Sequence, residues 1–321
     1  MVKAGFGIRC LTSALHVCSL FLFTFAATKN KLTLMNKKIR LLAFITFSLL
    51  TFVASAQTTT PTKKKEKKKE FYFSWGYNTE YYTHSNVKID QPSLGNDFTF
   101  EGIKGHDHEG WNNGLFSQAV SIPQYNYRLG LIIDKQKDWG VEINFDHTKF
   151  IFADQGAHIK GTLGGRTVDT VINFTLANGF YYYLNNGANF LLFNLVKRWH
   201  WYADKSQKVK VDFLAKGGIG PVIPHVQDGF FTNDSTAAYS HTSLVQKSND
   251  PHFQIGGWNV GVEGAIRATF FKYVYLEYTN KIDYARYSNL KIYEGTAKQA
   301  FGTYEFILNL GLTFPVGGRV N

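Results

Sequence analysis

Two short clusters in this 321-residue chain hold side chains that could do chemistry. The segment Gly105–Gly110 carries two histidines and two acids, and imidazole with carboxylate suits zinc or copper. Adjacent ligands on a loop rarely close a site, so we expect a solvated loop without a metal or cofactor. His84 and His241 stand beside Ser85 and Thr242, but a serine nucleophile also needs an acid to orient its base. No catalytic residue is assigned, and a non-enzymatic protein is favoured.

A larger set of charged residues recurs at every second position, opposite large apolar side chains. In a membrane barrel this charged face points inward, where charges must be paired because an unpaired buried charge is costly. We predict an interior polar network of Arg128, Glu142, Asp146, Arg198, Asp212, Glu263, Arg267, Glu277 and Lys281. The hairpin registers can place four pairs of side chains opposite each other: Arg267 with Glu277, Glu263 with Lys281, Arg128 with Asn144 or Asp146, and Arg198 with Asp212. A proton or ion path through the barrel is the functional alternative.

Beyond residue 70, apolar side chains follow the period of two that is typical of β-strands. This alternation predicts eight strands, over residues 71–84, 122–134, 139–151, 187–201, 208–219, 253–270, 273–284 and 300–314. Most exceed the roughly 9–11 residues that a strand needs to cross a bilayer. The clearest is the last, with Tyr304, Phe306, Leu308, Leu310, Leu312 and Phe314 on one face. The same parity places His147 on the lipid side, at the level of the headgroups.

The connections between these strands alternate in length. Three are tight, around residues 135–138, 202–207 and 271–272, and four are long, at residues 85–121, 152–186, 220–252 and 285–299. Transmembrane barrels have short periplasmic turns and long outer loops. The predicted fold class is therefore all-β, a single antiparallel up-and-down transmembrane β-barrel of eight strands over residues 71–314. A soluble all-β fold is the alternative, although nothing in such a fold requires this alternation.

The basic charge of the chain lies almost wholly in its first 70 residues. Residues 1–56 hold seven Lys or Arg and no acid, residues 63–70 add six bases and two acids, and residues 71–321 hold 22 of each sign. The folded part is thus not a basic body that would bind nucleic acid. Both cysteines, Cys10 and Cys18, lie in the leader, so the mature chain forms no disulfide.

The N-terminal region has the pattern of a secretory leader. Residues 35–56 combine a basic start, an apolar run and small residues at the end, as in a signal peptide. Residues 1–34 are then a mis-assigned extension of the start; the alternative is that they are translated and anchor the chain. Residues 57–70 are polar and rich in lysine, and we expect a disordered tether in the periplasm. Residues 315–321 form a C-terminal tail.

With these features the chain resembles the small eight-stranded outer-membrane β-barrel proteins of Gram-negative bacteria. The resemblance covers residues 71–314 and rests on the leader, the amphipathic strands, the loop asymmetry and the aromatic last strand. That strand is similar to the signal recognised by the barrel-insertion machinery, although here Pro315–Asn321 follows Phe314. The resemblance implies an outer-membrane location, outer-membrane lipids around the barrel, and the insertion machinery as a partner during biogenesis.

Members of this group serve as structural or adhesive barrels, as conduits for small molecules, or as enzymes that modify lipid A, and a shared fold does not choose among them. A lipid A deacylase would need a His-x-Ser-Asn pattern, which neither His84-Ser85-Asn86 nor His241-Thr242-Ser243 matches. We expect a non-enzymatic barrel whose long surface loops bind an unidentified extracellular ligand or support neighbouring proteins. The alternatives are a lipid A acyl hydrolase or transferase and a conduit for small apolar molecules.

Overall fold

The computed structural model describes residues 69–107, 124–152, 155–174, 181–185, 187–232, 245–247 and 252–316. The predicted leader, most of the tether and the end of the C-terminal tail lie outside these ranges. Strands dominate the described residues, whose one helical element is a short 3-10 turn, η2 (Pro92–Leu94). No helix in these ranges is long and apolar enough to cross a bilayer.

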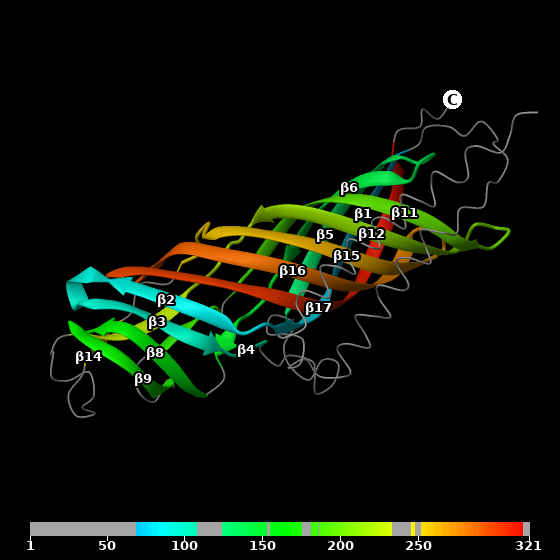
Figure 1. Cartoon of the computed structure of the whole chain (residues 1–321). Coiled ribbons are helices and arrows are strands. Elements are labelled where there is room, and N and C mark those ends of the chain that lie inside the picture. Colours follow the sequence, from blue (N-terminus) through cyan, green and yellow to red (C-terminus); the bar gives the residue numbers. More distant parts are fainter. Residues whose placement is uncertain are drawn as a thin grey trace, which may run out of the picture. The chain divides into compact units, whose positions relative to one another are not determined.

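Eight strands form a closed antiparallel barrel (Figure 1). In order around the wall they are β1 (Lys69–Tyr82), β5 (Tyr125–Asp134), β6 (Trp139–Asp146), β11 (Phe190–Ala203), β12 (Val209–Pro221), β15 (Gly257–Phe270), β16 (Val274–Ile292) and β17 (Gly295–Val316). Each strand pairs with the next, and β17 pairs back with β1 to close the sheet. The predicted eight-stranded up-and-down barrel is confirmed, and each predicted strand overlaps its observed counterpart.

Three short turns join barrel strands at one end, which we call the turn end. They span residues 135–138, 204–208 and 271–273, close to the three predicted tight connections. Lys69 and Val316 pair at the same end, so the barrel begins and finishes there. The opposite end, beyond which β16 and β17 continue, we call the loop end.

The outer wall of the barrel is apolar. On β17 the outward Leu308, Leu310 and Leu312 are between 43% and 56% exposed and alternate with buried residues. Exposed aromatic side chains bracket this band: Trp139, Trp201, Tyr273 and Phe314 toward the turn end, and Tyr81, Trp258 and Tyr284 toward the loop end. A rise of about 3.3 Å per residue and a strand tilt of roughly 40° give the stretch from Tyr304 to Phe314 a height of about 25 Å, as in transmembrane barrels. Apolar patches of this extent are rare in water and stable in hydrocarbon.

Strand β16 reverses its polarity part-way along its length. As far as Tyr284 its outward side chains are mainly apolar or aromatic, and its inward side chains are polar, as at Glu277 and Lys281. Beyond that point the inward side chains are Ala285, Tyr287, Leu290 and Ile292, and Arg286 and Lys291 are exposed. In the first half of β16 the outward side chains face lipid and the inward side chains face a polar interior. In the second half the outward side chains face water and the inward side chains face an apolar core. The loop-end boundary of the membrane band therefore lies at Tyr284.

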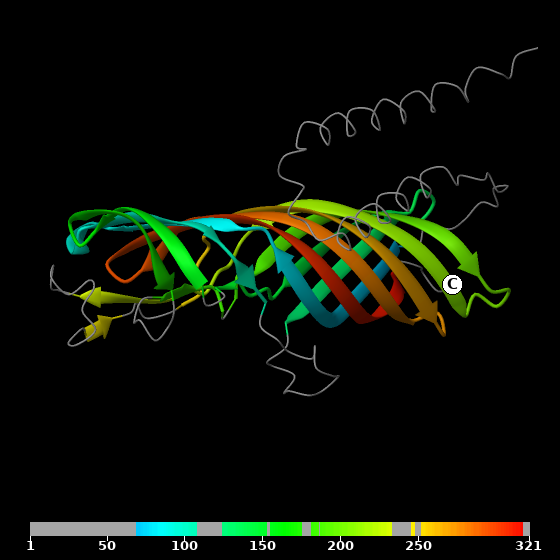
Figure 2. The same ribbon diagram turned by 60° about the horizontal axis from the view of Figure 1, so that its bottom comes forward.

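Beyond this boundary the sheet continues as an extension of four further strands. They are β2 (Ser85–Gln91), β3 (Asn96–Ile103), β8 (Gln155–Leu163) and β9 (Arg166–Phe174), which add in that order to β17. In Figure 2 these cyan and green strands lie past one end of the barrel. A separate three-stranded sheet consists of β10 (Tyr181–Tyr183), β13 (Gln227–Thr232) and β14 (Val245–Lys247), and β4 (Gly105–His106) pairs with β7 (Ile151–Phe152).

The prediction of four long loops is therefore wrong in part, because each predicted loop contains strand residues. For the predicted loop at residues 285–299, the cause is the reversal of polarity in β16. Above the membrane band, the apolar positions move to the opposite parity, so the alternation breaks at Ala285 although β16 continues to Ile292. The alternation pattern therefore predicts that the strand ends at residue 284.

An apolar core fills the inner side of the extension. Its centre is Phe301, whose ring centroid lies 4.5 Å from that of Phe150 and 5.3 Å from that of Tyr287. The surrounding buried side chains include Val87, Ile89, Phe98, Phe100, Ile159 and Val168. Phe190 joins this core to the barrel interior, since its ring lies 6.5 Å from Phe301 and 5.0 Å from the Lys281 ammonium. Each such aromatic side chain contributes roughly 1.5–3 kcal/mol on burial, so the extension has a folded core of its own.

Candidate functional site

All nine residues of the predicted network are buried inside the barrel, with exposures between 0% and 5%. They come from β5, β6, β11, β12, β15 and β16, on the parity opposite to the lipid-facing side chains. The strand registers confirm three of the predicted oppositions: Arg267 with Glu277, Glu263 with Lys281, and Arg128 with Asn144.

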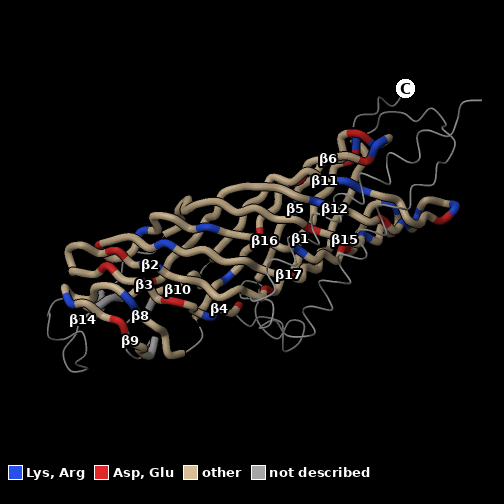
Figure 3. Tube along the Cα trace, viewed as in Figure 1, with Lys and Arg blue, Asp and Glu red and all other residues tan. Residues whose placement is uncertain are grey.

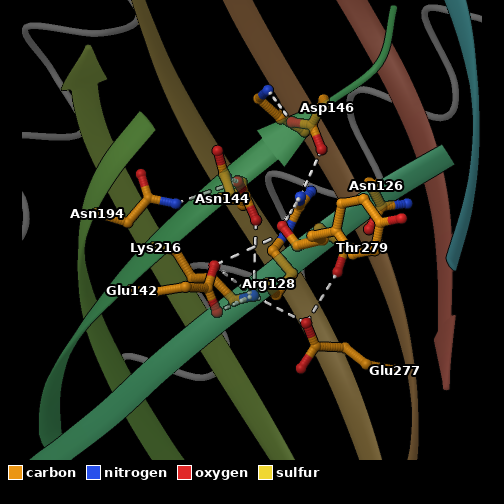
Figure 4. Close-up of polar contacts among 12 residues, drawn as sticks. Asn126, Arg128, Glu142, Asn144, Asp146, Asn194, Lys216, Glu277 and Thr279 are labelled. Atoms are coloured by element: carbon orange, nitrogen blue, oxygen red, sulfur yellow. Dashed lines mark hydrogen bonds and ion pairs between the residues drawn. The ribbon is translucent and has the colours of Figure 1, made fainter. Parts of the chain in front are cut away.

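Lys216 on β12 organises the centre of the interior. Its ammonium lies 2.9 Å from Glu142, 2.8 Å from Glu277 and 3.6 Å from Glu263, and these side chains are at most 1% exposed (Figure 4). Glu263 also accepts a hydrogen bond from the Asn144 amide at 2.5 Å. One ammonium therefore holds three carboxylates from three different strands, β6, β15 and β16.

Arg267 supplies a second cation to this layer. It donates to Glu277 at 2.6 Å, and its guanidinium lies 4.2 Å and 4.1 Å from the ring centroids of Tyr72 and Tyr275. A planar, weakly hydrated guanidinium suits such a position between two aromatic faces. Gly130 on the neighbouring strand leaves room for the Tyr72 ring, because a Cβ at this position would come within 2.0 Å of the ring.

Toward the loop end, two cations hold a group of acids. The Lys281 ammonium lies 2.6 Å from Asp146, 3.1 Å from Glu305 and 3.6 Å from Asp283. Arg128 donates to the other oxygen of Asp146 at 2.5 Å (Figure 4). These side chains are between 0% and 2% exposed, so no water-sized space adjoins most of their surface. Side chains rather than a channel occupy this level of the barrel, as an eight-stranded wall allows.

At the turn end, the predicted opposition of Arg198 and Asp212 is wrong. Asp212 lies opposite His200, whose Nδ1 is 2.6 Å from its carboxylate. Arg198 binds Glu70 at 2.6 Å and Asp138 at 3.0 Å instead. The physical reason is the five-residue turn at 204–208 together with a bulge in β11 just after His200, which shift the pairing away from the predicted register.

The predicted network omits several charged residues that the structure places in it, among them Lys216, Glu305 and Glu70. Lys216 and Glu305 have the inward parity of their strands, so alternation alone could have found them. Glu70 follows the lysine run and was assigned to the tether, but β1 begins at Lys69 and Glu70 is 8% exposed. A strand that begins inside a charged tract has no sequence signal at its start.

Of the two histidine–serine clusters, only the one at His84 and Ser85 lies in the described residues. The Ser85 hydroxyl donates to the Ala300 carbonyl at 3.1 Å. His147, predicted at the lipid headgroups, is only 8% exposed; its Nδ1 lies 2.7 Å from Asn189 Oδ1 and its ring stacks on Tyr125. That prediction is wrong, because neighbouring side chains cover the ring where β6 ends. The His241 cluster lies outside the described residues.

The candidate metal loop is described only as far as Asp107. His106 Nδ1 lies 2.6 Å from the Asp107 carbonyl oxygen, and β4 pairs with β7. Within the described ranges, no group of three or more His, Cys, Asp or Glu side chains is arranged to hold a metal ion. His108 and Glu109, the other two residues of that cluster, lie outside these ranges.

The outer face of the extension carries a charged group that spans three strands. His158 on β8 contacts Glu101 on β3 at 2.8 Å and Asp169 on β9 at 2.7 Å, one through each ring nitrogen. These hydrogen bonds to Glu101 and Asp169 raise the pKa of His158 above its ordinary value. Lys160 lies 3.5 Å from Asp169 on the same face. This face is suited to water, in contrast to the barrel wall below it.

No protein-family model and no curated protein sequence matches the chain. Solved barrel structures are similar to it at low identity. Outer membrane protein OprG from Pseudomonas aeruginosa is 12% identical with a TM-score of 0.32, over 79% of this chain and 99% of OprG. Outer membrane protease OmpT from Escherichia coli is 10% identical with a TM-score of 0.31, over 81% and 100%. Neisserial surface protein A is 11% identical with a TM-score of 0.30, over 76% and 97%. The fold assignment therefore rests on the strand pairing of this chain itself.

Proposed function

We propose that this chain is an outer-membrane protein whose closed barrel anchors a surface-exposed β-sheet, and that this sheet binds an extended polypeptide. The turn end faces the periplasm and the extension faces outward. Outer-membrane lipids surround the apolar band, and the insertion machinery recognises the last strand during biogenesis. The observation that carries the binding proposal is β9, which is the edge strand of the extension in the described part of the chain.

The filled interior supports anchoring rather than transport. Lys216, Arg267, Lys281 and their carboxylate partners occupy the barrel at exposures of 0–4%. The apolar core around Phe301 lies directly beyond them toward the loop end. A small apolar molecule would have to displace paired buried charges, which is strongly unfavourable.

Strand β9 has the geometry of a binding edge. In the described part of the chain it pairs with β8 alone. The turn between them has two residues, Gly164 and Gly165, both with positive φ, so the closing pair Leu163–Arg166 is hydrogen-bonded. By alternation, Thr167, Asp169 and Val171 then direct their N–H and C=O groups away from β8. An added strand can pair with these groups, as in β-augmentation.

The sequence of β9 protects this edge only with Arg166 beside the turn and with Asp169, whose carboxylate is paired with His158 and Lys160. Soluble proteins protect edge strands with lysine, proline or bulges. Arg166–Phe174 contains no lysine or proline, its pairing with β8 has no register shift, and Val171 is 64% exposed. Five of its nine residues are β-branched, which favours strand pairing. An edge of this length with so little protection is expected where a partner strand binds.

Peptide selection tests the binding proposal. Purified protein in lipid nanodiscs is screened against a phage library of extended peptides, and selected peptides are titrated against variants. Val171→Pro removes one N–H from the free edge, and the matched control Val171→Thr keeps it. We expect Val171→Pro to weaken binding at least about tenfold, through a lost hydrogen bond and a steric block to pairing. Peptides that bind Val171→Pro as tightly as Val171→Thr would show that β9 is not the binding edge.

Single-barrel conductance tests the anchoring proposal separately. In planar bilayers we expect no ion current, because the charged interior and the core around Phe301 leave no open path. The Phe301→Trp variant, with a larger side chain in the core, is measured beside the parent protein. Discrete conductance steps from both folded proteins would contradict a blocked interior. Outer-membrane placement is checked by fractionation after expression in a Gram-negative host, where recovery in any other fraction would count against it.

A further inference from the structure

A cavity of about 210 Å³ opens at the turn end of the barrel. At roughly 30 Å³ for each water molecule, it has room for about seven waters. Polar residues from several separate segments line it, among them Gln207, Lys210, Thr269, Lys272, Tyr273 and Thr313. These residues belong to two turns and to β12, β15 and β17. The cavity is therefore built by the closed barrel and cannot form in a single hairpin.

The acids that line the cavity are already paired. Glu70 lies 2.6 Å from Arg198 and 2.9 Å from Lys135, which also line it. Asp212 lies 2.6 Å from His200. These contacts neutralise the two carboxylates within the wall of the cavity. They leave no carboxylate of the lining to balance the remaining cations.

Two of the lysines that line this cavity are not paired with an acid in the described residues. Lys210 is on β12, and Lys272 is in the turn between β15 and β16. Within the described residues neither has an ion-pair partner. The Lys272 N–H donates to the Lys208 carbonyl at 3.3 Å, which holds the two turns together. Figure 3 shows Lys and Arg residues together with Asp and Glu residues around the turns at this end. Two like charges on the lining of one cavity repel each other, and an anion bound between them would remove this repulsion.

The remaining lining groups are hydrogen-bond donors at the level of lipid headgroups. The Thr269 hydroxyl can donate to an oxyanion, and so can the second N–H of the Gln207 amide, whose first donates to the Asp204 carbonyl at 3.4 Å. The Thr313 hydroxyl donates to the Phe71 carbonyl at 3.3 Å instead. Tyr273 and Phe314, which also line the cavity, belong to the aromatic residues that bracket the apolar band. Such belts lie at the membrane–water interface, where phospholipids place their phosphates. We infer that this cavity binds a phosphate group between Lys210 and Lys272, supplied by free phosphate or by a phospholipid headgroup.

Titrations of the full-length protein test this inference. The protein is refolded in a non-ionic maltoside detergent, which contains no phosphate, and backbone amides are followed by NMR. Inorganic phosphate is the first probe, and glycerophosphoglycerol, a soluble headgroup, is the second. The variant is Lys210→Gln with Lys272→Gln. The matched control is Lys208→Gln, a neighbouring lysine that does not line the cavity.

We expect saturable shifts of the amides of Lys210, Thr269 and Lys272, and at least about tenfold weaker binding in the double variant but not in Lys208→Gln. Tighter binding of one probe identifies the source of the phosphate. The absence of saturable shifts with both probes, or an equal loss in Lys208→Gln, overturns the inference. The phosphate arm does not depend on the proposed peptide partner, so its outcome is separate from that of the β9 experiments.

Discussion

Lys216→Met removes the cation that holds the centre of the barrel, and we expect a large loss of stability. Glu142 and Glu277 keep other partners, but Glu263 has no ion-pair partner within 4.0 Å in the described residues other than Lys216, at 3.6 Å. Removing one partner of a buried pair typically costs about 3–5 kcal/mol, because the other charge stays buried without compensation. The variant should therefore lose about 3–5 kcal/mol of unfolding free energy.

The assay is reversible urea unfolding in lipid vesicles, followed by tryptophan fluorescence. Lys208→Met is the control, since it removes an exposed lysine near the start of the same strand, and it should change stability by no more than about 0.5 kcal/mol. Adding Glu263→Gln to Lys216→Met should restore part of the loss by removing the uncompensated charge. If Lys216→Met costs less than about 1 kcal/mol, or Glu263→Gln restores nothing, the argument from buried pairing is refuted.

Two further predictions concern the two outer surfaces of the sheet. Leu310→Arg places a charge near the middle of the apolar band and should lower the unfolding free energy in vesicles by about 2–4 kcal/mol. Its control is Lys298→Leu, on the water-exposed part of the same strand, which should change that free energy by less than about 0.5 kcal/mol. Equal effects of the two variants would contradict the membrane boundary. Because Glu101 and Asp169 raise the pKa of His158, its contribution to the β3–β8–β9 contacts is fully present below the ordinary pKa and lost as pH rises through the raised value. NMR titration should therefore give a pKa above 6.5 that falls in Asp169→Asn, and an unchanged value in that variant would refute this cause.

The barrel was predictable from the sequence because each of its strands meets two fixed environments, lipid outside and a polar interior. This constraint imposes strict alternation, as from Tyr304 to Phe314, and it also sets the interior parity of Arg267 and Glu277. The extension was not predictable in the same way. Its strands meet water outside and an apolar core inside, so the rule reverses at Ala285, and only the folded sheet shows that β16 continues.

Within the interior, parity predicted which side chains are buried but not all of their partners. Arg267 and Glu277 face each other across a hairpin with a three-residue turn, where the register is simple. The contacts of Lys216 with Glu142 and Glu277 join strands that are not neighbours in the barrel wall. Contacts across the lumen depend on barrel closure, which no local pattern encodes. Arg198 was mispaired because the bulge in β11 and the five-residue turn shift the register, and its actual partner Glu70 lies on β1, which is not a neighbouring strand.

The most direct test of the account is the accessibility of spin labels along the outward positions of β16, in vesicles. Labels at Leu276, Tyr278 and Tyr284 should collide with dissolved oxygen, which concentrates in lipid, and be shielded from a water-soluble nickel complex. Labels at Arg286 and Lys291 should show the opposite, with the change between Tyr284 and Arg286. Nickel access at Leu276 equal to that at Arg286 would contradict a membrane-spanning barrel that passes into a water-exposed sheet at this point.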